Sequence, residues 1–182
     1  MMELERTLGP VLLEKIRNVR VLILDVDGVL TDGRIIISDD GQETKGFNVR
    51  DGHGLKMIKR IGVEVIFLTG RKSRVVEHRA RELGVDRVFQ GILDKRAVYE
   101  DLIAQGRMTP GQVAYMGDDI VDLPVLRRVG FSATVSDAHE EVLKAVDLVT
   151  VNPGGRGAVR EICEIIIKAQ GKWDEMMGRY RA

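Results

Sequence analysis

Two aspartates, Asp25 and Asp27, directly follow the apolar run at residues 21–24. A calcium loop of the EF-hand type that begins at Asp25 needs Gly at its sixth position and Glu at its twelfth, but Leu30 and Ile36 stand there. A turn in which Asp and Gly satisfy backbone groups does not account for two carboxylates beside a buried strand. The spacing therefore favours a chemical role for the pair.

Other polar groups come directly after later apolar runs, where buried strands are expected to end. They are Thr69-Gly70-Arg71, Asp94-Lys95, Gly117-Asp118-Asp119 with Asp122, and Asn152-Pro153-Gly154-Gly155. Open α/β sheets bind ligands beyond the carboxyl ends of their strands. We therefore expect these groups to lie close to Asp25 in the fold.

Phosphoryl transfer is the chemistry that suits this set of residues. Asp25 can attack phosphorus to form an aspartyl-phosphate, and Mg²⁺ held by Asp25 and Asp118 would offset the repulsion between two anions. Lys95 adds a fixed cation, and the Thr69 hydroxyl can donate to a phosphoryl oxygen. Asp27 can protonate the leaving alcohol and later activate water, and acidic neighbours would help it to keep its proton. Taken singly, Thr69 also fits a strand end and Lys95 a solvated helix start.

The metal site is expected to be built from carboxylates. Asp118 and Asp122 are four residues apart and can share one helix face, which suits one direct ligand and one supporting residue. Asp119 fits the start of that helix, where carboxylates are favoured. The predicted ligands are Asp25, Asp27, Asp118 and Asp122.

Apolar runs alternate with helical spacing along the chain, which predicts a mostly parallel sheet covered by helices on both faces. The expected fold is therefore an α/β, Rossmann-like three-layer sandwich. The predicted strands lie at 21–24, 63–68, 87–89, 113–116, 131–135 and 148–151. Helical spacing occurs at 55–61, 76–83, 97–103 and 123–129, and an amphipathic helix is expected near 158–170.

One segment, residues 33–49, interrupts this alternation. Its two short extended runs flank Asp39-Asp40-Gly41, which is a hairpin turn signal. The run Arg34–Ile37 is too apolar for solvent, so we expect this β-hairpin flap to pack on something, such as another subunit. A polar tail follows at about 171–182. No clear boundary divides the chain, so residues 1–182 are expected to form one domain.

The charges of the 182 residues balance, with 28 Lys and Arg against 28 Asp and Glu. No basic surplus therefore indicates nucleic acid or an anionic membrane as a partner. Cys163 is the only cysteine, which excludes an internal disulfide and a cysteine-rich zinc site. The sequence shows neither a signal peptide nor an apolar stretch long enough to span a membrane. We expect a soluble cytoplasmic protein.

In their order along the chain, the polar motifs resemble those of the haloacid dehalogenase superfamily: Asp25-Val26-Asp27-Gly28-Val29, Thr69-Gly70, Lys95, and Gly117-Asp118-Asp119 with Asp122. The resemblance implies a Rossmann-like core, Mg²⁺ and an aspartyl-phosphate mechanism. Most members carry a sizeable cap domain, whereas only the flap lies between the first two motifs here. The chain thus resembles capless members, which often use a partner subunit to cover small substrates.

Longer stretches are similar to the family of phosphatases that act on 3-deoxy-D-manno-octulosonate 8-phosphate (KDO 8-phosphate), among them DVDGVLTDG, KGFNVRDGHG, LTGRKS and GGRGAVRE. This resemblance implies lipopolysaccharide sugar synthesis, a homotetramer with the flaps at its centre, and a C-terminal tail that can close a neighbour's site. Arginine side chains suit a substrate carboxylate, and Lys56 stands where many members have Arg. The implied substrate-binding residues are Asn48, Val49, Arg50, Asp51, Gly52, Lys56, Gly70, Arg71 and Arg79. His53 and His78 are expected to be surface or turn residues.

Three alternatives remain at this stage. A phosphatase of a related nine-carbon keto sugar acid phosphate would differ only in the shape of its pocket. A signalling receiver domain carries its phospho-accepting Asp after the third strand and has no acid/base two residues beyond it, so Asp27 and the late GDDIVD motif disfavour that class. A non-catalytic regulatory domain of the same fold would not need the full acidic set together with Lys95.

Overall fold

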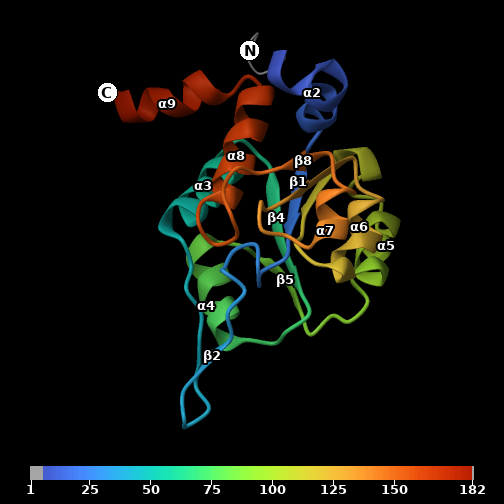
Figure 1. Ribbon diagram of the computed structural model, residues 1–182. Coiled ribbons are helices and arrows are strands. Elements are labelled where there is room, and N and C mark those ends of the chain that lie inside the picture. The colour runs from blue at the N-terminus through green and yellow to red at the C-terminus, as the bar shows by residue number, and fades with distance from the viewer. Residues whose placement is uncertain (1–5, 182) are drawn as a thin grey trace.

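The computed structural model describes residues 6–181, and its centre is a six-stranded parallel sheet (Figure 1). The strands are β1 (Val21–Leu24), β4 (Glu64–Thr69), β5 (Arg87–Gln90), β6 (Val113–Met116), β7 (Phe131–Thr134) and β8 (Leu148–Val149). They lie in the order β5-β4-β1-β6-β7-β8, which is the doubly wound order of Rossmann-like proteins. The predicted fold class and all the predicted strands are confirmed, with small differences at the strand ends.

Helices cover both faces of the sheet, because alternate side chains of each strand enter two separate cores. On β1, Leu22 and Leu24 face the core packed by α2, α3, α4 and α8, whereas Val21 and Ile23 face the core packed by α5, α6 and α7. The helices of the first face are α2 (Pro10–Arg17), α3 (Val49–Arg60), α4 (Arg74–Leu83) and α8 (Ala158–Ala169). Those of the second are α5 (Lys95–Ala104), α6 (Leu123–Leu126) and α7 (Glu140–Leu143).

The direction in which the chain crosses the sheet changes between β1 and β6, which are hydrogen-bonded neighbours. From β1, the chain adds β4 and β5 on one side, and it then returns to add β6, β7 and β8 on the other. The loops at such a switch point diverge, and doubly wound proteins bind ligands there. Asp25 directly follows β1, and Gly117-Asp118 directly follows β6, so the fold places both acidic motifs at this point.

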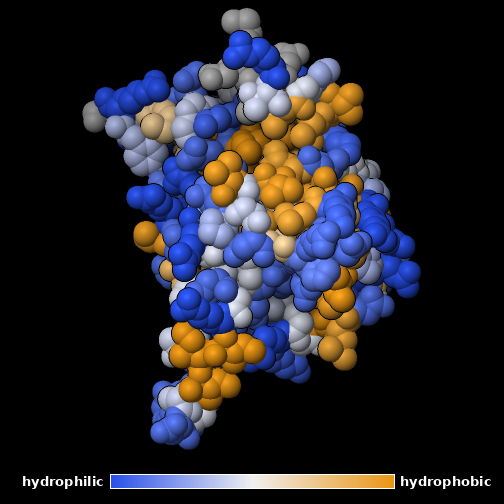
Figure 2. Space-filling model, in the orientation of Figure 1, coloured by the Kyte–Doolittle hydropathy of each residue, from blue (hydrophilic) through white to orange (hydrophobic). Residues whose placement is uncertain are grey.

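The predicted hairpin flap is confirmed. Its strands β2 (Ile36–Ile37) and β3 (Glu43–Thr44) pair antiparallel and project away from the sheet (Figure 1). Ile35, Ile36 and Ile37 are 56%, 48% and 59% exposed, and a hydrophobic surface covers the same part of the hairpin in Figure 2. A contiguous exposed apolar surface of this kind is typical of an interaction site.

The polar tail predicted at about 171–182 is helical, since residues Trp173–Arg181 form helix α9. Met176 is buried, and the ammonium of Lys168 lies 4.5 Å from the centre of the Trp173 ring. Two single 3₁₀ turns are also present, at Pro110–Gln112 and Ile120–Asp122. Among residues 6–181, no helix combines the length and apolarity that a membrane crossing requires.

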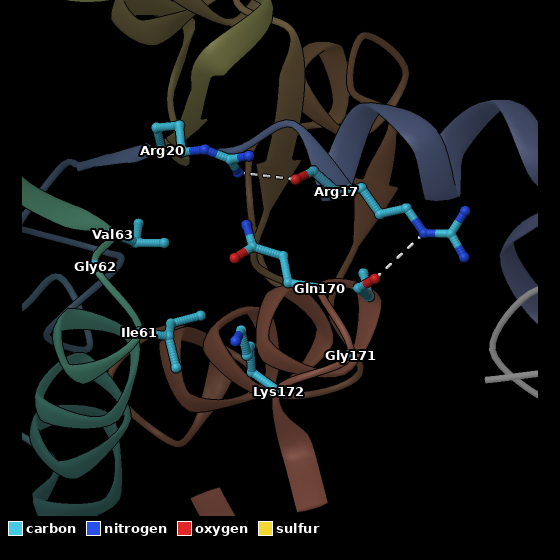
Figure 3. A pocket seen from close by; sticks show the side chains of 9 residues that line it. Arg17, Arg20, Ile61, Gly62, Val63, Gln170, Gly171 and Lys172 are labelled. Carbon is cyan, nitrogen blue, oxygen red and sulfur yellow. Dashed lines mark hydrogen bonds between the residues drawn. The ribbon is translucent and has the colours of Figure 1, made fainter. Parts of the chain in front are cut away.

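A cavity of about 530 Å³ (Figure 3) lies at the amino-terminal edge of the sheet. The acidic motifs follow β1 and β6 and therefore lie at the opposite edge. Arg20 and Val63 line the cavity just before β1 and β4, and Gln170 lines it from the end of α8. Arg20 donates to the backbone oxygens of Arg17 at 3.0 Å and Val19 at 2.9 Å, and Gln170 donates to that of Val19 at 2.7 Å. These bonds tie α2 to β1 and α8, which is a structural role.

Candidate active site

Three carboxylates meet at the carboxyl edge of the sheet. Asp25 follows β1, Asp118 follows β6, and Asp122 ends the next 3₁₀ turn; oxygens of the three lie within 4.8 Å of one another. Lys95, the first residue of α5, joins them, because its ammonium lies 2.8 Å from Asp25 Oδ2 and 2.7 Å from Asp122 Oδ1. The structure thus brings together residues that the sequence predicted to act jointly.

Gly28 allows the loop after β1 to approach Asp118 closely. Its φ of 89° lies in the left-handed region that favours glycine. A Cβ at this position would lie 2.0 Å from Asp118 Oδ2, so any side chain would displace that carboxylate. The glycine of the first motif is therefore needed both for the turn and for the packing of the acidic cluster.

The cluster carries more negative charge than Lys95 neutralises. Burial raises the pKa of Asp25 to about 6, and Asp122 adds to this effect while Lys95 opposes it. Burial also raises the pKa of Asp118 to about 8, with further contributions from Asp25 and Asp122. Burial disfavours the charged form of Lys95, but Asp122 and Asp25 outweigh it and raise the pKa of the lysine. Lys95 therefore stays charged.

A divalent cation fits this cluster. Asp118 Oδ1 is buried and has no hydrogen-bond partner among residues 6–181, which is costly for a carboxylate. Mg²⁺ binds through oxygen ligands and commonly uses one or two carboxylates. Asp25 and Asp118, whose ionised forms the surroundings disfavour, are the groups that a bound cation would stabilise, and we infer that they are the direct ligands.

Asp122 belongs to the same cluster, but its oxygens are already in use. Oδ1 accepts hydrogen bonds from Lys95 and from the Tyr115 hydroxyl at 2.5 Å. Oδ2 accepts the backbone N–H groups of Asp118 at 3.1 Å and Asp119 at 3.2 Å. A carboxylate has about four lone-pair sites, so this bonding gives Asp122 a supporting role. Asp119 caps the 3₁₀ turn that follows, as expected.

Tyr115 was not found by sequence reasoning. It lies on β6 and is fully buried, and burial, followed by the charge of Asp122, raises the pKa of its hydroxyl well above the usual range. The hydroxyl therefore keeps its proton and donates a hydrogen bond to Asp122. A signal was present in the sequence, because a tyrosine within a buried strand needs a hydrogen-bond partner, and an acidic motif begins two residues later.

Asp27 lies in a cationic environment. Lys45 Nζ contacts Asp27 Oδ1, and Arg71 Nε lies 3.9 Å from Oδ2. The expectation that acidic neighbours help Asp27 to keep its proton is therefore wrong, because its side chain turns toward the cations of the flap while Asp118 and Asp122 gather around Asp25. In the described part of the chain, the carboxylate of Asp27 is also outside the group that could hold a metal ion.

Glu43 connects the two cations that face Asp27. Its Oε1 lies 3.1 Å from Arg71 Nη2 and 3.4 Å from Lys45 Nζ, so four side chains form a closed ring of alternating charge. Arg71, which was expected to bind substrate, pairs here with carboxylates. Sequence reasoning missed Glu43 and Lys45, because nothing in a short polar strand separates a buried lysine from a solvated one.

The predicted substrate segment, residues 48–52, forms the first turn of α3, and Asn48 caps it with its side chain. Arg79 packs against this turn: its Nη2 donates to the Asn48 backbone oxygen at 3.2 Å, and its guanidinium lies 5.5 Å from the centre of the Phe47 ring. A Cβ at Gly52 would lie 2.2 Å from Arg79 Nη2. Gly52 is therefore required for this close approach.

Asp51 is not available to a substrate, which contradicts its predicted binding role. It is 1% exposed, and its carboxylate accepts the N–H groups of Gly157 at 3.1 Å and Arg160 at 2.8 Å at the start of α8. Asp51 therefore holds α3 against α8. The remaining predicted residues are Thr69, which is buried at the end of β4, and the exposed Val49, Arg50, Lys56 and Gly70.

His53 lies near the surface, as expected, but on helix α3 rather than in a turn, and its ring is engaged on both sides. Its Nδ1 lies 2.9 Å from Arg160 Nη1, and its Nε2 lies 3.0 Å from the Tyr180 hydroxyl. Burial lowers the pKa of His53, and the charges of Arg160 and Arg60 lower it further, which favours the neutral ring. Arg60 also donates to Tyr180 at 3.0 Å. Helix α9 thus docks on α3 of its own chain.

Comparison with protein families agrees with this fold and site. Residues 87–162 match the family of haloacid dehalogenase-like hydrolases. This region contains Lys95 and the acidic motif after β6, and the fold places both beside the aspartate that follows β1. The fold and the site together define a phosphoric monoester hydrolase of the haloacid dehalogenase type.

Comparison with individual proteins identifies phosphatases within this superfamily to which the chain is similar. The chain is 46% identical to a 3-deoxy-D-manno-octulosonate 8-phosphate phosphatase of Escherichia coli, over 94% of this chain and 93% of that protein. The crystal structure of the Yersinia pestis phosphatase of the same name is 44% identical, with a TM-score of 0.88 over 90% of this chain and 89% of that one. The Moraxella catarrhalis phosphatase, solved with magnesium, phosphate and KDO, is 38% identical, with a TM-score of 0.91 over 93% and 97% of the two chains. The chain belongs to the 3-deoxy-D-manno-octulosonate 8-phosphate phosphatase family.

Proposed function

We propose that this protein hydrolyses KDO 8-phosphate to KDO and inorganic phosphate with Mg²⁺, in the cytoplasm and in the synthesis of lipopolysaccharide. The observation that carries the proposal is the buried Oδ1 of Asp118, which has no hydrogen-bond partner in the described part of the chain and lies in one cluster with Asp25 and Lys95. Three carboxylates around one lysine suit a cation and a phosphate ester. The magnesium, phosphate and KDO bound by the Moraxella catarrhalis relative support the same ligands here.

In the first step, a carboxylate oxygen of Asp25 attacks phosphorus as the bond between phosphorus and the sugar oxygen breaks. Asp27 gives its proton to that sugar oxygen. Lys95 orients Asp25 through its contact at Oδ2, and the hydroxyl of Thr69 donates to a phosphoryl oxygen. Mg²⁺, when bound, supplies the positive charge that lets an anionic carboxylate approach an anionic ester.

In the second step, water attacks the phosphorus of the aspartyl-phosphate. Asp27, which is now a carboxylate, takes a proton from that water. The bond between phosphorus and the Asp25 oxygen breaks, which gives inorganic phosphate and the free Asp25 carboxylate. Asp27 is again protonated, so the enzyme returns to its starting state with no net gain or loss of protons.

Recognition of the sugar acid falls to the groups around the flap and the first turn of α3. Arg71 already pairs with the Glu43 carboxylate, a group of the same kind as the carboxylate of KDO. We propose that the substrate carboxylate takes the place of Glu43 on this guanidinium. Arg79 acts by holding the backbone of Asn48 in position.

Hydrolysis of a panel of phosphorylated sugar acids in the presence of Mg²⁺ tests this function. KDO 8-phosphate should give the highest kcat/KM, and a chelator or the Asp25→Asn change should abolish turnover. A nine-carbon keto sugar acid phosphate in the same panel tests the alternative substrate: a higher kcat/KM for it than for KDO 8-phosphate would favour that class. Turnover that survives chelation, or no hydrolysis of any phosphate monoester, would contradict the proposal.

We further propose that the chain acts as one domain and assembles as a homotetramer through its flap. The exposed Ile35, Ile36 and Ile37 support this assembly. The change Ile36→Ser should lower the molar mass measured by light scattering, because it weakens the apolar contact. Val11, which is 75% exposed on α2, offers the control: Val11→Ser should leave the mass unchanged. An unchanged mass for Ile36→Ser would rule out assembly through the flap.

A further inference from the structure

We propose that Lys45 positions Asp27 for proton transfer, so that the flap takes part in the chemistry as well as covering the substrate. This inference rests on the proposed phosphatase function, in which Asp27 serves as acid and base. Lys45 is a positioning residue in this account, because it acts through Asp27.

Lys45 differs from the rest of the flap in its burial. The strands of the flap are largely exposed, yet the Lys45 side chain is only 1% exposed. A buried ammonium is costly unless it is paired, and the two partners of Lys45 are Asp27 Oδ1 and Glu43 Oε1. Since Lys45 directly follows β3, these contacts pin the base of the flap to the loop that carries Asp27.

The two oxygens of Asp27 face different cations. Lys45 contacts Oδ1, whereas Arg71 lies 3.9 Å from Oδ2. The Arg71 side chain is 44% exposed and also forms an ion pair with Glu43. Lys45 is therefore the firmer of the two contacts, and it fixes the rotation of the carboxylate. The Asp27 side chain remains 21% exposed, so it can meet a substrate while Lys45 behind it cannot.

Orientation matters here because proton transfer requires a hydrogen bond between Asp27 and the leaving oxygen. A carboxylate without Lys45 would still be present, but it would rotate and shift toward Arg71. The activity lost on replacing Lys45 should therefore depend on how much the leaving group needs a proton. A lysine that merely stabilised the fold, or that bound the phosphate, would affect good and poor leaving groups equally.

Two aryl phosphates of similar size provide the test: phenyl phosphate, whose leaving group needs a proton, and 4-nitrophenyl phosphate, whose leaving group does not. General acid catalysis is typically worth 10²–10⁴-fold, so Lys45→Met should lower kcat/KM for phenyl phosphate by roughly ten- to a hundredfold. The loss for 4-nitrophenyl phosphate should stay below about threefold. Lys45→Arg should restore most of the activity toward phenyl phosphate. As a matched control, Lys144→Met removes an exposed lysine of α7's C-terminal end and should change neither value.

A double variant separates positioning from an independent role. In the Asp27→Asn background, Lys45→Met should cause no further loss with phenyl phosphate, because its effect acts through Asp27. Equal losses for the two esters, or losses that multiply in the double variant, would overturn the proposal. If Lys45→Met does not fold, Lys45→Gln carries the same comparison. A wild-type protein that hydrolyses neither ester and also leaves KDO 8-phosphate intact would instead refute the phosphatase function itself.

Discussion

Asp25 and Asp27 stand two residues apart in one loop, but the structure gives them opposite surroundings. Asp25 lies with Asp118 and Asp122 around a single lysine, whereas Asp27 faces Lys45 and Arg71. The difference arises because β1 delivers Asp25 to the switch point of the sheet, while Asp27 turns toward the flap. The first region is short of positive charge and suits a metal ion. The second already has its cations, which fix the position of the Asp27 carboxylate beside the flap.

The largest expected difference between the two regions is in catalysis. Asp25→Asn removes the nucleophile, and loss of a nucleophile costs up to about 10⁶-fold in a well-studied protease; we expect a loss of at least about 10⁴-fold here. Asp27→Asn removes the acid and base, which is typically worth about 10²–10⁴-fold. Steady-state kinetics with KDO 8-phosphate measures both. Similar activity for Asp25→Asn and the wild type would show that Asp25 is not the nucleophile.

The two regions should also differ in stability. Without Mg²⁺, Asp118→Asn removes a half-buried carboxylate whose Oδ1 has no hydrogen-bond partner among residues 6–181, and it should raise Tm by a few degrees. Asp27→Asn leaves the buried Lys45 with only Glu43 and should lower Tm. Thermal melts in the presence of a chelator measure both changes. If the two variants shift Tm in the same direction, the claim that the Asp25 region lacks positive charge while the Asp27 region has it is wrong.

The pH dependence of stabilisation by Mg²⁺ sharpens the comparison further. The pKa of Asp118 rises from 3.8 to about 8 on folding, so the metal-free protein loses stability from this group as pH rises between these values. Mg²⁺ favours the ionised form, so it should raise Tm more at about pH 8.5 than at about pH 6. Melts with and without saturating Mg²⁺ give the shift at each pH. The Asp118→Asn control should lose most of the difference, and an equal shift at both pH values in the wild type would contradict the account.

The smallest expected effect concerns Tyr115, which acts on the acidic region only through Asp122. Tyr115→Phe keeps the ring in the core but removes the donor to Oδ1. We expect kcat to fall by roughly tenfold, which corresponds to about 1.4 kcal/mol and is close to the low end for a hydrogen bond to a charged group. KM should change little, because no substrate contact is lost. Tm of Tyr115→Phe reports any packing defect. A change confined to KM would refute a supporting role in the acidic cluster.

The sequence was enough to predict the sheet and the acidic cluster, because both follow from local patterns. Apolar runs indicate the strands, and the carboxyl ends of parallel strands lie at the same edge of a sheet. Asp25, Lys95 and Asp118 follow such ends, so they are expected to lie close together. The surroundings of Asp27 could not be predicted in this way. They depend on how the flap folds back, and its strands carry no pattern that buries Lys45.

Two other residues show the same limit. Asp51 and His53 lie on α3, but their partners belong to α8 and α9, more than a hundred residues later. Asp51 looked like a substrate ligand from its motif, and only the packing of α3 on α8 shows that its carboxylate bonds the start of that helix. Helical spacing predicts which face of α3 is buried, but it does not identify the polar group that contacts this face in the folded chain.

The central claim, that Asp25 receives the phosphoryl group while Asp27 moves protons, is tested most directly by pre-steady-state release of 4-nitrophenolate. Expulsion of this leaving group needs no acid, whereas hydrolysis of the aspartyl-phosphate still needs a base. The Asp27→Asn variant should therefore release a burst of 4-nitrophenolate that matches the concentration of active sites, followed by slow turnover, and Asp25→Asn should show neither. A missing burst in Asp27→Asn, or continued turnover in Asp25→Asn, would contradict this division of roles.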